Sequence, residues 1–150
     1  ASDSEFRAAV TASFMLSADN AHAVHPNHPE KYDADNRTFM NGGVVIKHNA
    51  NQKYTTDAVS CAIFETICKN AGVPTQHFAN RSDILGGSTL GNIANTQVSL
   101  NTVDIGLPQL AMHSVYETAG VKDLEYMIAG LKKFYETEIV MLGDGEFVLK

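Results

Sequence analysis

The sequence predicts an α/β fold, with helices layered on both faces of a largely parallel or mixed sheet. Apolar, β-branched runs typical of buried strands alternate with segments whose apolar residues recur at helical spacing. Glycine and proline separate these segments, and no internal repeat or linker interrupts them. The chain of 150 residues can bury a sizeable core, so we expect one domain and no second one.

Charge and hydropathy exclude several classes of partner. The formal net charge is −6, and the 11 Lys and Arg residues are scattered along the chain. This argues against a nucleic acid or an anionic membrane as the main partner. No apolar run approaches the length of a membrane span. Residues 1–10 hold three charged side chains and no apolar segment, so we expect no signal peptide and a cytoplasmic protein.

The two cysteines are predicted to be free. Cys61 and Cys68 lie seven positions apart in one expected helix, which separates them by roughly 10.5 Å along its axis. A disulfide needs Cα atoms within about 7 Å of each other. We therefore expect two core thiols in a reducing compartment.

The first half of the chain is expected to present a loop between two strands. Residues 8–18 are small or apolar and predict a buried strand. Residues 20–42 form a long loop rich in Asn, Asp, His and Pro, and loops of this length are usually functional. Two glycines then open residues 44–47, Val-Val-Ile-Lys, whose continuous apolar run at 44–46 predicts a strand buried on both faces.

The middle of the chain predicts a helix followed by a strand. Side-chain oxygens in residues 55–57 can cap a helix whose apolar residues recur at helical spacing. Gly72 ends this helix, and Pro74 prevents its continuation. A short strand is expected around residues 76–79.

The second half repeats the alternation of helix and strand. Ser88 and Thr89 are expected to cap a helix that runs to about residue 98. Residues 102–106 predict a strand that Pro108 stops. Asp123 is then expected to cap a last helix with an apolar stripe.

A polar cluster follows the first expected strand. Asp19, His22, His25 and His28 lie within ten residues and include half of the six histidines. Carboxylate oxygens and imidazole nitrogens suit zinc or a similar divalent ion. One hypothesis is that Asp19, His22 and His25 jointly bind one ion in a metal-dependent hydrolase. A polar loop that hydrogen-bonds its own turns explains the stretch equally well.

Two further side chains lie at element ends. His113 follows a strand and a proline, where α/β sheets often place ligands. Glu117, four residues after His113, could orient the imidazole ring of His113 or be a solvated helix residue. Lys47 ends a buried strand and could pair with an acidic substrate group or simply reach water.

The glycine-rich turn at residues 86–91 precedes a predicted helix, and its amides could receive an anion. It is neither a Walker loop nor a dinucleotide fingerprint, and a tight turn packed on the sheet is the simpler interpretation. No Gly-x-Ser-x-Gly elbow is present, and neither cysteine has an adjacent base. Nucleophilic hydrolases are therefore disfavoured.

Five motifs together resemble one family. The chain from about residue 13 to 138 resembles the aspartyl aminopeptidase and vacuolar aminopeptidase family of dinuclear-zinc metallopeptidases. The motifs occur in the family's order and with similar spacing, at residues 17–27, 42–47, 80–83, 86–91 and 108–114.

The resemblance implies a role for four of the side chains above. Asp19 matches a carboxylate ligand of one zinc, and His113 matches the histidine ligand of the other. His22 matches a histidine that lines the substrate site, and Lys47 a lysine that meets an acidic first residue. Asn20 stands where the family has methionine, at a position that is not a ligand.

The resemblance also implies that part of the catalytic machinery lies outside this chain. Family members are several-fold longer, and their upstream part holds a histidine ligand, the bridging aspartate, a Glu-Glu pair and a dimerisation domain. No Glu-Glu pair occurs here, so we assign no catalytic residue to this chain. We interpret residues 1–150 as the C-terminal segment of a zinc aminopeptidase catalytic domain.

By this resemblance, the parent protein would remove N-terminal residues from peptides by hydroxide attack at two zinc ions. Lys47 alone does not decide whether the parent protein prefers substrates with an acidic first residue. We expect the isolated segment to bind zinc weakly, to lack peptidase activity, and to form homo-oligomers that cover bare sheet edges. The alternative is a stand-alone binding or regulatory module that has the fold without the metal site.

Overall fold

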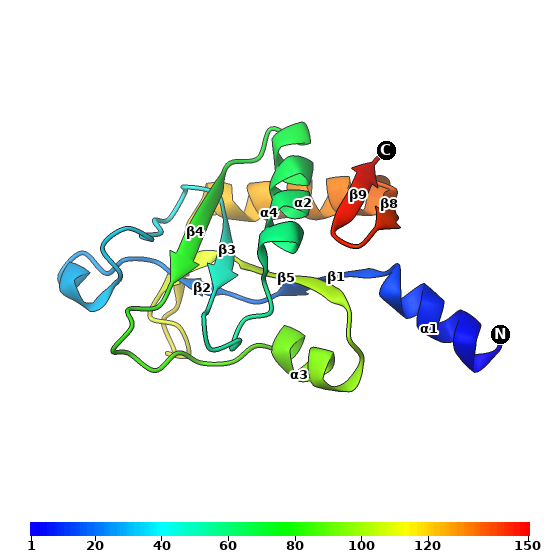
Figure 1. Ribbon diagram of the computed structural model, residues 1–150. Coiled ribbons are helices and arrows are strands. Elements are labelled where there is room, and N and C mark those ends of the chain that lie inside the picture. Colours follow the sequence, from blue (N-terminus) through cyan, green and yellow to red (C-terminus); the bar gives the residue numbers. More distant parts are fainter.

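The computed structural model describes all residues, 1–150 (Figure 1). No helix is both long and apolar enough to cross a membrane. In chain order the elements are α1 Asp3–Thr11, β1 Phe14–Ala18, β2 Ala21–His22, the 3₁₀ turn η1 Pro29–Lys31, β3 Val44–His48, α2 Ala58–Asn70, β4 Thr75–Ala79, α3 Leu90–Gln97, β5 Asn101–Gly106, β6 Pro108–Leu110, β7 Thr118–Ala119, α4 Val121–Glu136, β8 Ile139–Gly143 and β9 Glu146–Leu149.

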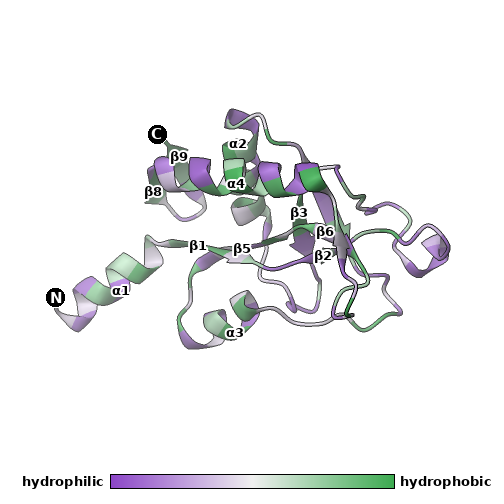
Figure 2. Cartoon of the chain, turned by 180° about the vertical axis from the view of Figure 1, so that it is seen from behind, coloured by the Kyte–Doolittle hydropathy of each residue, from purple (hydrophilic) through white to green (hydrophobic).

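A four-stranded mixed sheet forms the centre of the fold. Its strand order is β1-β5-β3-β4, with β1 parallel to β5, β3 parallel to β4, and β3 antiparallel to β5. Helices α2 and α4 cover one face, and α3 lies on the other (Figures 1 and 2). The layered α/β architecture predicted from the sequence is therefore confirmed, in its mixed-sheet form.

Strand β3 is buried on both faces, as its continuous apolar run predicts. Val44 and Ile46 pack with the helix α2 side chain Phe64 in the larger core cluster. Val45, on the opposite face, packs with Tyr54 and two further residues in a smaller cluster. Because side chains alternate along a strand, β3 contributes to both layers of the core.

The predicted strand at residues 8–18 is wrong in its first half. Residues Asp3–Thr11 form the exposed helix α1, which extends away from the sheet, and β1 begins only at Phe14 (Figure 1). A capping box starts this helix: Ser2 Oγ accepts from the Glu5 amide at 3.3 Å, and the Ser2 amide donates to Glu5 Oε2 at 2.6 Å. The Ser-x-x-Glu spacing that signals this box is visible in the sequence.

Asp123 does not cap the last helix. The N-cap of α4 is Gly120, without a side-chain cap. The buried Asp123 carboxylate instead accepts hydrogen bonds from the amides of Asn41, at 2.5 Å, and Gly43, at 3.0 Å. Gly43 has φ +113°, and a Cβ there would lie 2.1 Å from the Pro74 carbonyl oxygen. Asp123 thus fixes a turn that only glycine fits.

Three smaller features also differ from the sequence-based expectations. Residues 20–42 contain β2 and η1 within the loop. Pro108 does not end the strand pairing but opens β6, which pairs with β2. The hairpin β8–β9 was not expected, although its Asp144-Gly145 turn between apolar runs is a typical hairpin signal.

The cysteines agree with the prediction. Cys61 and Cys68 are both free and buried in α2. Burial raises the pKa of the Cys61 thiol to about 11 and that of Cys68 to about 12. Both thiols are therefore protonated in the metal-free chain at neutral pH.

We predict that Asp123→Ala lowers the free energy of unfolding by about 2–3 kcal/mol, because the buried Gly43 amide loses its acceptor. Urea unfolding measures this as a lower midpoint at constant slope. The matched control is Glu125→Ala on the exposed side of the same helix, where we expect a change within about 0.5 kcal/mol. Equal midpoints for the two variants would contradict the assignment.

Candidate functional site

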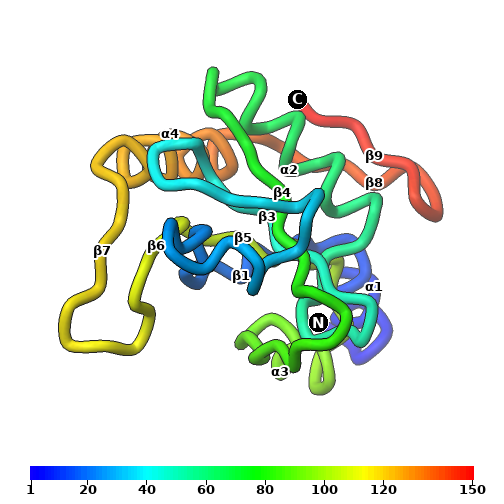
Figure 3. Tube along the Cα trace, turned by 90° about the vertical axis from the view of Figure 1, so that its left-hand side faces the viewer, coloured from blue at the N-terminus to red at the C-terminus, as the bar shows by residue number.

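The four side chains singled out from the sequence line one cavity. Asp19, His22, Lys47 and His113 surround a space of about 110 Å³. Asp19 directly follows β1, His22 ends β2, Lys47 lies in β3, and His113 lies in the loop that projects between β6 and β7 (Figure 3). Residues from distant parts of the chain thus meet at one place.

Asp19 presents a free carboxylate oxygen to this cavity. Its amide donates to the Ile105 carbonyl at 3.0 Å, which extends the β1–β5 pairing to this residue. Oδ1 accepts from the Asn20 amide at 2.7 Å, and Oδ2 has no hydrogen-bond partner in the chain. The side chain is exposed, so it can bind a cation without first losing a protein partner.

His113 is held by its backbone rather than by its ring. Its φ of 68° lies in the left-handed region, which few non-glycine residues adopt. The Glu117 carboxylate accepts from the His113 amide at 2.6 Å, so it orients the backbone and not the imidazole. Neither ring nitrogen has a hydrogen bond within the chain. Backbone conformations of this kind often occur at functional sites.

Lys47 does not reach water. Only 2% of the residue is exposed, and Nζ donates one long hydrogen bond, 3.3 Å, to the Asn20 carbonyl. The ammonium lies 5.2 Å from the centroid of the Tyr54 ring. Burial lowers the pKa of Lys47, while the nearby Asp19 and Asp104 carboxylates oppose this effect. A buried, weakly satisfied cation is suited to binding an anionic group.

His22 lies between this cavity and a larger one. Its ring packs 6.2 Å from that of Phe78. Desolvation lowers the pKa of His22, and the neighbouring His113 and Lys47 lower it further. The adjoining cavity of about 250 Å³ shares His22 and Phe78 among its lining residues. Together the two cavities offer room for more than a metal ion.

Asp104 is a polar residue of this region that the sequence analysis missed. It is fully buried in β5, where Oδ2 accepts from the amide and hydroxyl of Thr55 at 2.6 and 2.8 Å. Oδ1 accepts from the Thr89 hydroxyl at 2.7 Å. Thr89 is the N-cap residue of α3, as predicted, but its hydroxyl bonds β5 and makes no cap hydrogen bond to the helix. A lone carboxylate inside an apolar strand was the available signal.

The glycine-rich turn contributes to the cavity, whereas two loop histidines do not. Gly87, Ser88 and Thr89 line it beside the four predicted side chains. His25 accepts from the Asn27 amide at 3.2 Å, and its ring faces that of His28. The structure therefore does not assemble Asp19, His22 and His25 around one ion.

Comparisons with known proteins agree with the resemblance described above. The sequence profile of the aminopeptidase I zinc metalloprotease (M18) family matches residues 1–135. A probable M18 family aminopeptidase 2 from Clostridium acetobutylicum is 50% identical over 131 residues, which cover 87% of this chain and 30% of the relative. A probable aspartyl aminopeptidase from Ricinus communis is 45% identical over 136 residues, covering 90% of this chain and 28% of the relative.

Solved structures show the same fold. In the cryo-EM structure of the Ape4 and Nbr1 complex, the similar chain has a TM-score of 0.88 and 40% identity, covering 90% of this chain and 26% of that one. The crystal structure of prApe1 has a TM-score of 0.83 and 29% identity, covering 87% and 27%. This chain thus spans less than a third of these proteins. It belongs to the aminopeptidase I zinc metalloprotease (M18) family.

Proposed function

We propose that this chain is the C-terminal segment of the catalytic domain of a zinc aminopeptidase. In this proposal Asp19 is a ligand of one zinc ion and His113 a ligand of a second, while His22 and Lys47 bind the peptide substrate. One observation supports this proposal most directly: the four side chains line one cavity, although they come from four separate parts of the chain.

The donor atoms at the cavity fit zinc. Zinc binds carboxylate oxygens and imidazole nitrogens, and Asp19 Oδ2 and the His113 ring are both free of hydrogen bonds. When bound, the metal ions supply a Lewis acid near the scissile carbonyl. Both side chains are exposed, so further ligands and the general base can approach from other parts of a parent protein.

Lys47 and His22 account for substrate binding. An acidic side chain that entered the cavity would give the buried Lys47 ammonium a stronger partner than its single 3.3 Å hydrogen bond. His22, whose pKa is lowered, is neutral at pH 7 and can both donate and accept a hydrogen bond. This chemistry favours peptides with an acidic first residue.

Large apolar side chains are exposed on the surface of this chain, as expected if other protein segments or subunits cover them. Val115 and Tyr116, in the loop that holds His113, are almost fully exposed, as is Leu85. One structural relative, S. cerevisiae mApe1, is described as a dodecamer, with a TM-score of 0.77 and 28% identity over 87% of this chain and 28% of that one. We propose a homo-oligomeric parent protein, located in the cytoplasm, where its thiols stay reduced.

A chimera tests the metal ligands. The 131 matched residues of the Clostridium acetobutylicum relative are replaced by their counterparts from this chain, so that the relative supplies the remaining ligands and the base. We expect hydrolysis of aminoacyl p-nitroanilides by the chimera and none by the isolated 150-residue chain. Asp19→Asn and His113→Ala should each reduce kcat/KM about a hundredfold or more, because each zinc loses a ligand.

His25→Ala and His28→Ala are the matched controls, since both rings lie outside the cavity. They should retain the activity of the chimera within about threefold. A folded chimera without activity would favour the alternative of a binding or regulatory module. A large loss in His25→Ala but not in His113→Ala would favour the single-ion hypothesis instead.

Lys47→Met in the same chimera tests the substrate preference. Because the substitution removes the cation but keeps the volume of the side chain, we expect about a tenfold or greater loss of kcat/KM on aspartyl and glutamyl substrates. Alanyl and leucyl substrates should change by less than about threefold. An equal loss on all substrates would show that Lys47 has only a structural role.

Sedimentation velocity tests association. We predict that the isolated chain forms dimers or larger species as its concentration rises, because exposed apolar side chains become buried between copies. Val115→Ser/Tyr116→Ser should reduce this association, since both side chains lie on the projecting loop. A single monomeric species at the highest concentration would contradict the prediction.

A further inference from the structure

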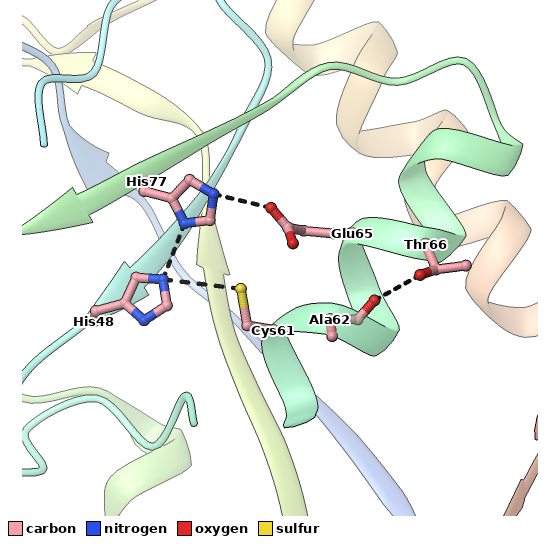
Figure 4. A network of polar contacts seen from close by, with 6 residues as sticks. All are labelled: His48, Cys61, Ala62, Glu65, Thr66 and His77. Atoms are coloured by element: carbon pink, nitrogen blue, oxygen red, sulfur yellow. Dashed lines mark hydrogen bonds and ion pairs between the residues drawn. The ribbon is translucent and has the colours of Figure 1, made fainter. Parts of the chain in front are cut away.

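A second group of side chains with potential metal-ligand atoms lies on the other face of the sheet. His48, Cys61 and His77 bring their ligand atoms within 4.8 Å of one another (Figure 4). None of the three lines the cavity that contains Asp19 and His113. We propose that they bind one divalent ion of the zinc type through two nitrogens and one sulfur.

The fold places all three side chains at one edge of the sheet. Ile46 of β3 lies opposite His77 of β4 in the parallel register. His48 lies two residues after Ile46, so both imidazoles are on the face that α2 covers. Lys47, which lies between Ile46 and His48 in the strand, points to the opposite face, toward the cavity that contains Asp19 and His113. Cys61 projects from the first turns of α2 toward the two rings (Figure 4).

The distances between donor atoms suit tetrahedral coordination. His48 Nε2 lies 3.1 Å from His77 Nδ1 and 4.0 Å from Cys61 Sγ. Bond lengths of about 2.0 Å to nitrogen and about 2.3 Å to sulfur give tetrahedral separations of about 3.3 and 3.5 Å. The observed separations differ from these values by about 0.2 and 0.5 Å, so small side-chain rotations bring both pairs to them.

Glu65 adds a second and independent observation. Its carboxylate lies 2.9 Å from His77 Nε2 (Figure 4). A proton held on Nε2 by this contact leaves His77 Nδ1 with a free lone pair, which accepts from His48 Nε2 in the metal-free chain. When the metal binds, His48 takes its other tautomer, with the proton on its own Nδ1, so that both facing nitrogens can bind the ion. Zinc-binding histidines commonly have such a carboxylate on the nitrogen that does not bind the metal. Glu65 follows Cys61 by four residues, so one helical face supplies both groups.

The charges of the group also suit a divalent cation. Binding exchanges the Cys61 thiol proton, which is released to solvent, for a bond from the thiolate to the metal. The Cys61 thiolate and the Glu65 carboxylate then balance the two positive charges. About 40% of the His77 and Glu65 side chains is exposed, so an ion has access from solvent and keeps one open position. A thiolate with two imidazoles favours zinc or cobalt over magnesium or calcium.

Cobalt titration of the metal-free 150-residue chain tests the site. We expect a sulfur-to-cobalt charge-transfer band that saturates at one cobalt per chain and that zinc abolishes by competition. The Asp19 and His113 centre contains no sulfur, so Asp19→Asn/His113→Ala should keep the band. This separates the inference from the proposed aminopeptidase function.

Substitutions identify the ligands. Cys61→Ser should abolish the band, and His48→Gln or His77→Gln should weaken cobalt binding at least about tenfold, while Glu65→Gln weakens it about 10–100-fold. Cys68→Ser, seven residues further along the same helix, is the control and should leave the titration unchanged. Circular dichroism must show that each variant keeps its helices. No band in the unmodified chain, or an unchanged band in folded Cys61→Ser, would overturn the proposal.

Discussion

The buried Asp104 carboxylate is the interaction on which the proposed substrate site depends. It accepts three hydrogen bonds, two from Thr55 and one from Thr89, and so attaches two loops to β5. Those loops carry Tyr54 and the glycine-rich turn, which line the cavity. A buried carboxylate is tolerated only when it is hydrogen-bonded or paired. Asp104 also keeps a negative charge near Lys47, which offsets the burial of the ammonium.

Strand β3 connects the two candidate sites through the alternation of its side chains. Lys47 points toward the cavity with Asp19, whereas His48 points toward Cys61 beneath α2. A shift of the register by one residue would exchange their faces and disrupt both sites. The apolar residues before them prevent such a shift, because Val44 and Ile46 must remain in the larger core cluster. The core that stabilises the fold therefore also sets the orientation of the polar groups.

The sequence predicts those parts of the structure that local patterns determine. The β3 run, helix α2 and the motif around Asp19 each have a local signal, and the resemblance linked Asp19 with His113. Helix α1 was missed although Ser2 and Glu5 form a recognisable capping box. The contacts of Asp123 could not be predicted, because its partners lie about eighty residues earlier in the chain. No local pattern reports a hydrogen bond of that kind.

The two candidate sites differ in what this chain contributes to them. Asp19 and His113 are exposed side chains that provide one ligand to each proposed zinc, too few to hold a metal pair tightly. His48, Cys61 and His77 lie on two paired strands and one helix, all of which this chain supplies. The proposed three-ligand site requires no other segment, whereas the proposed aminopeptidase centre does. Metal binding by the isolated chain is therefore expected first at the thiolate site, and catalysis only when a parent protein completes the other one.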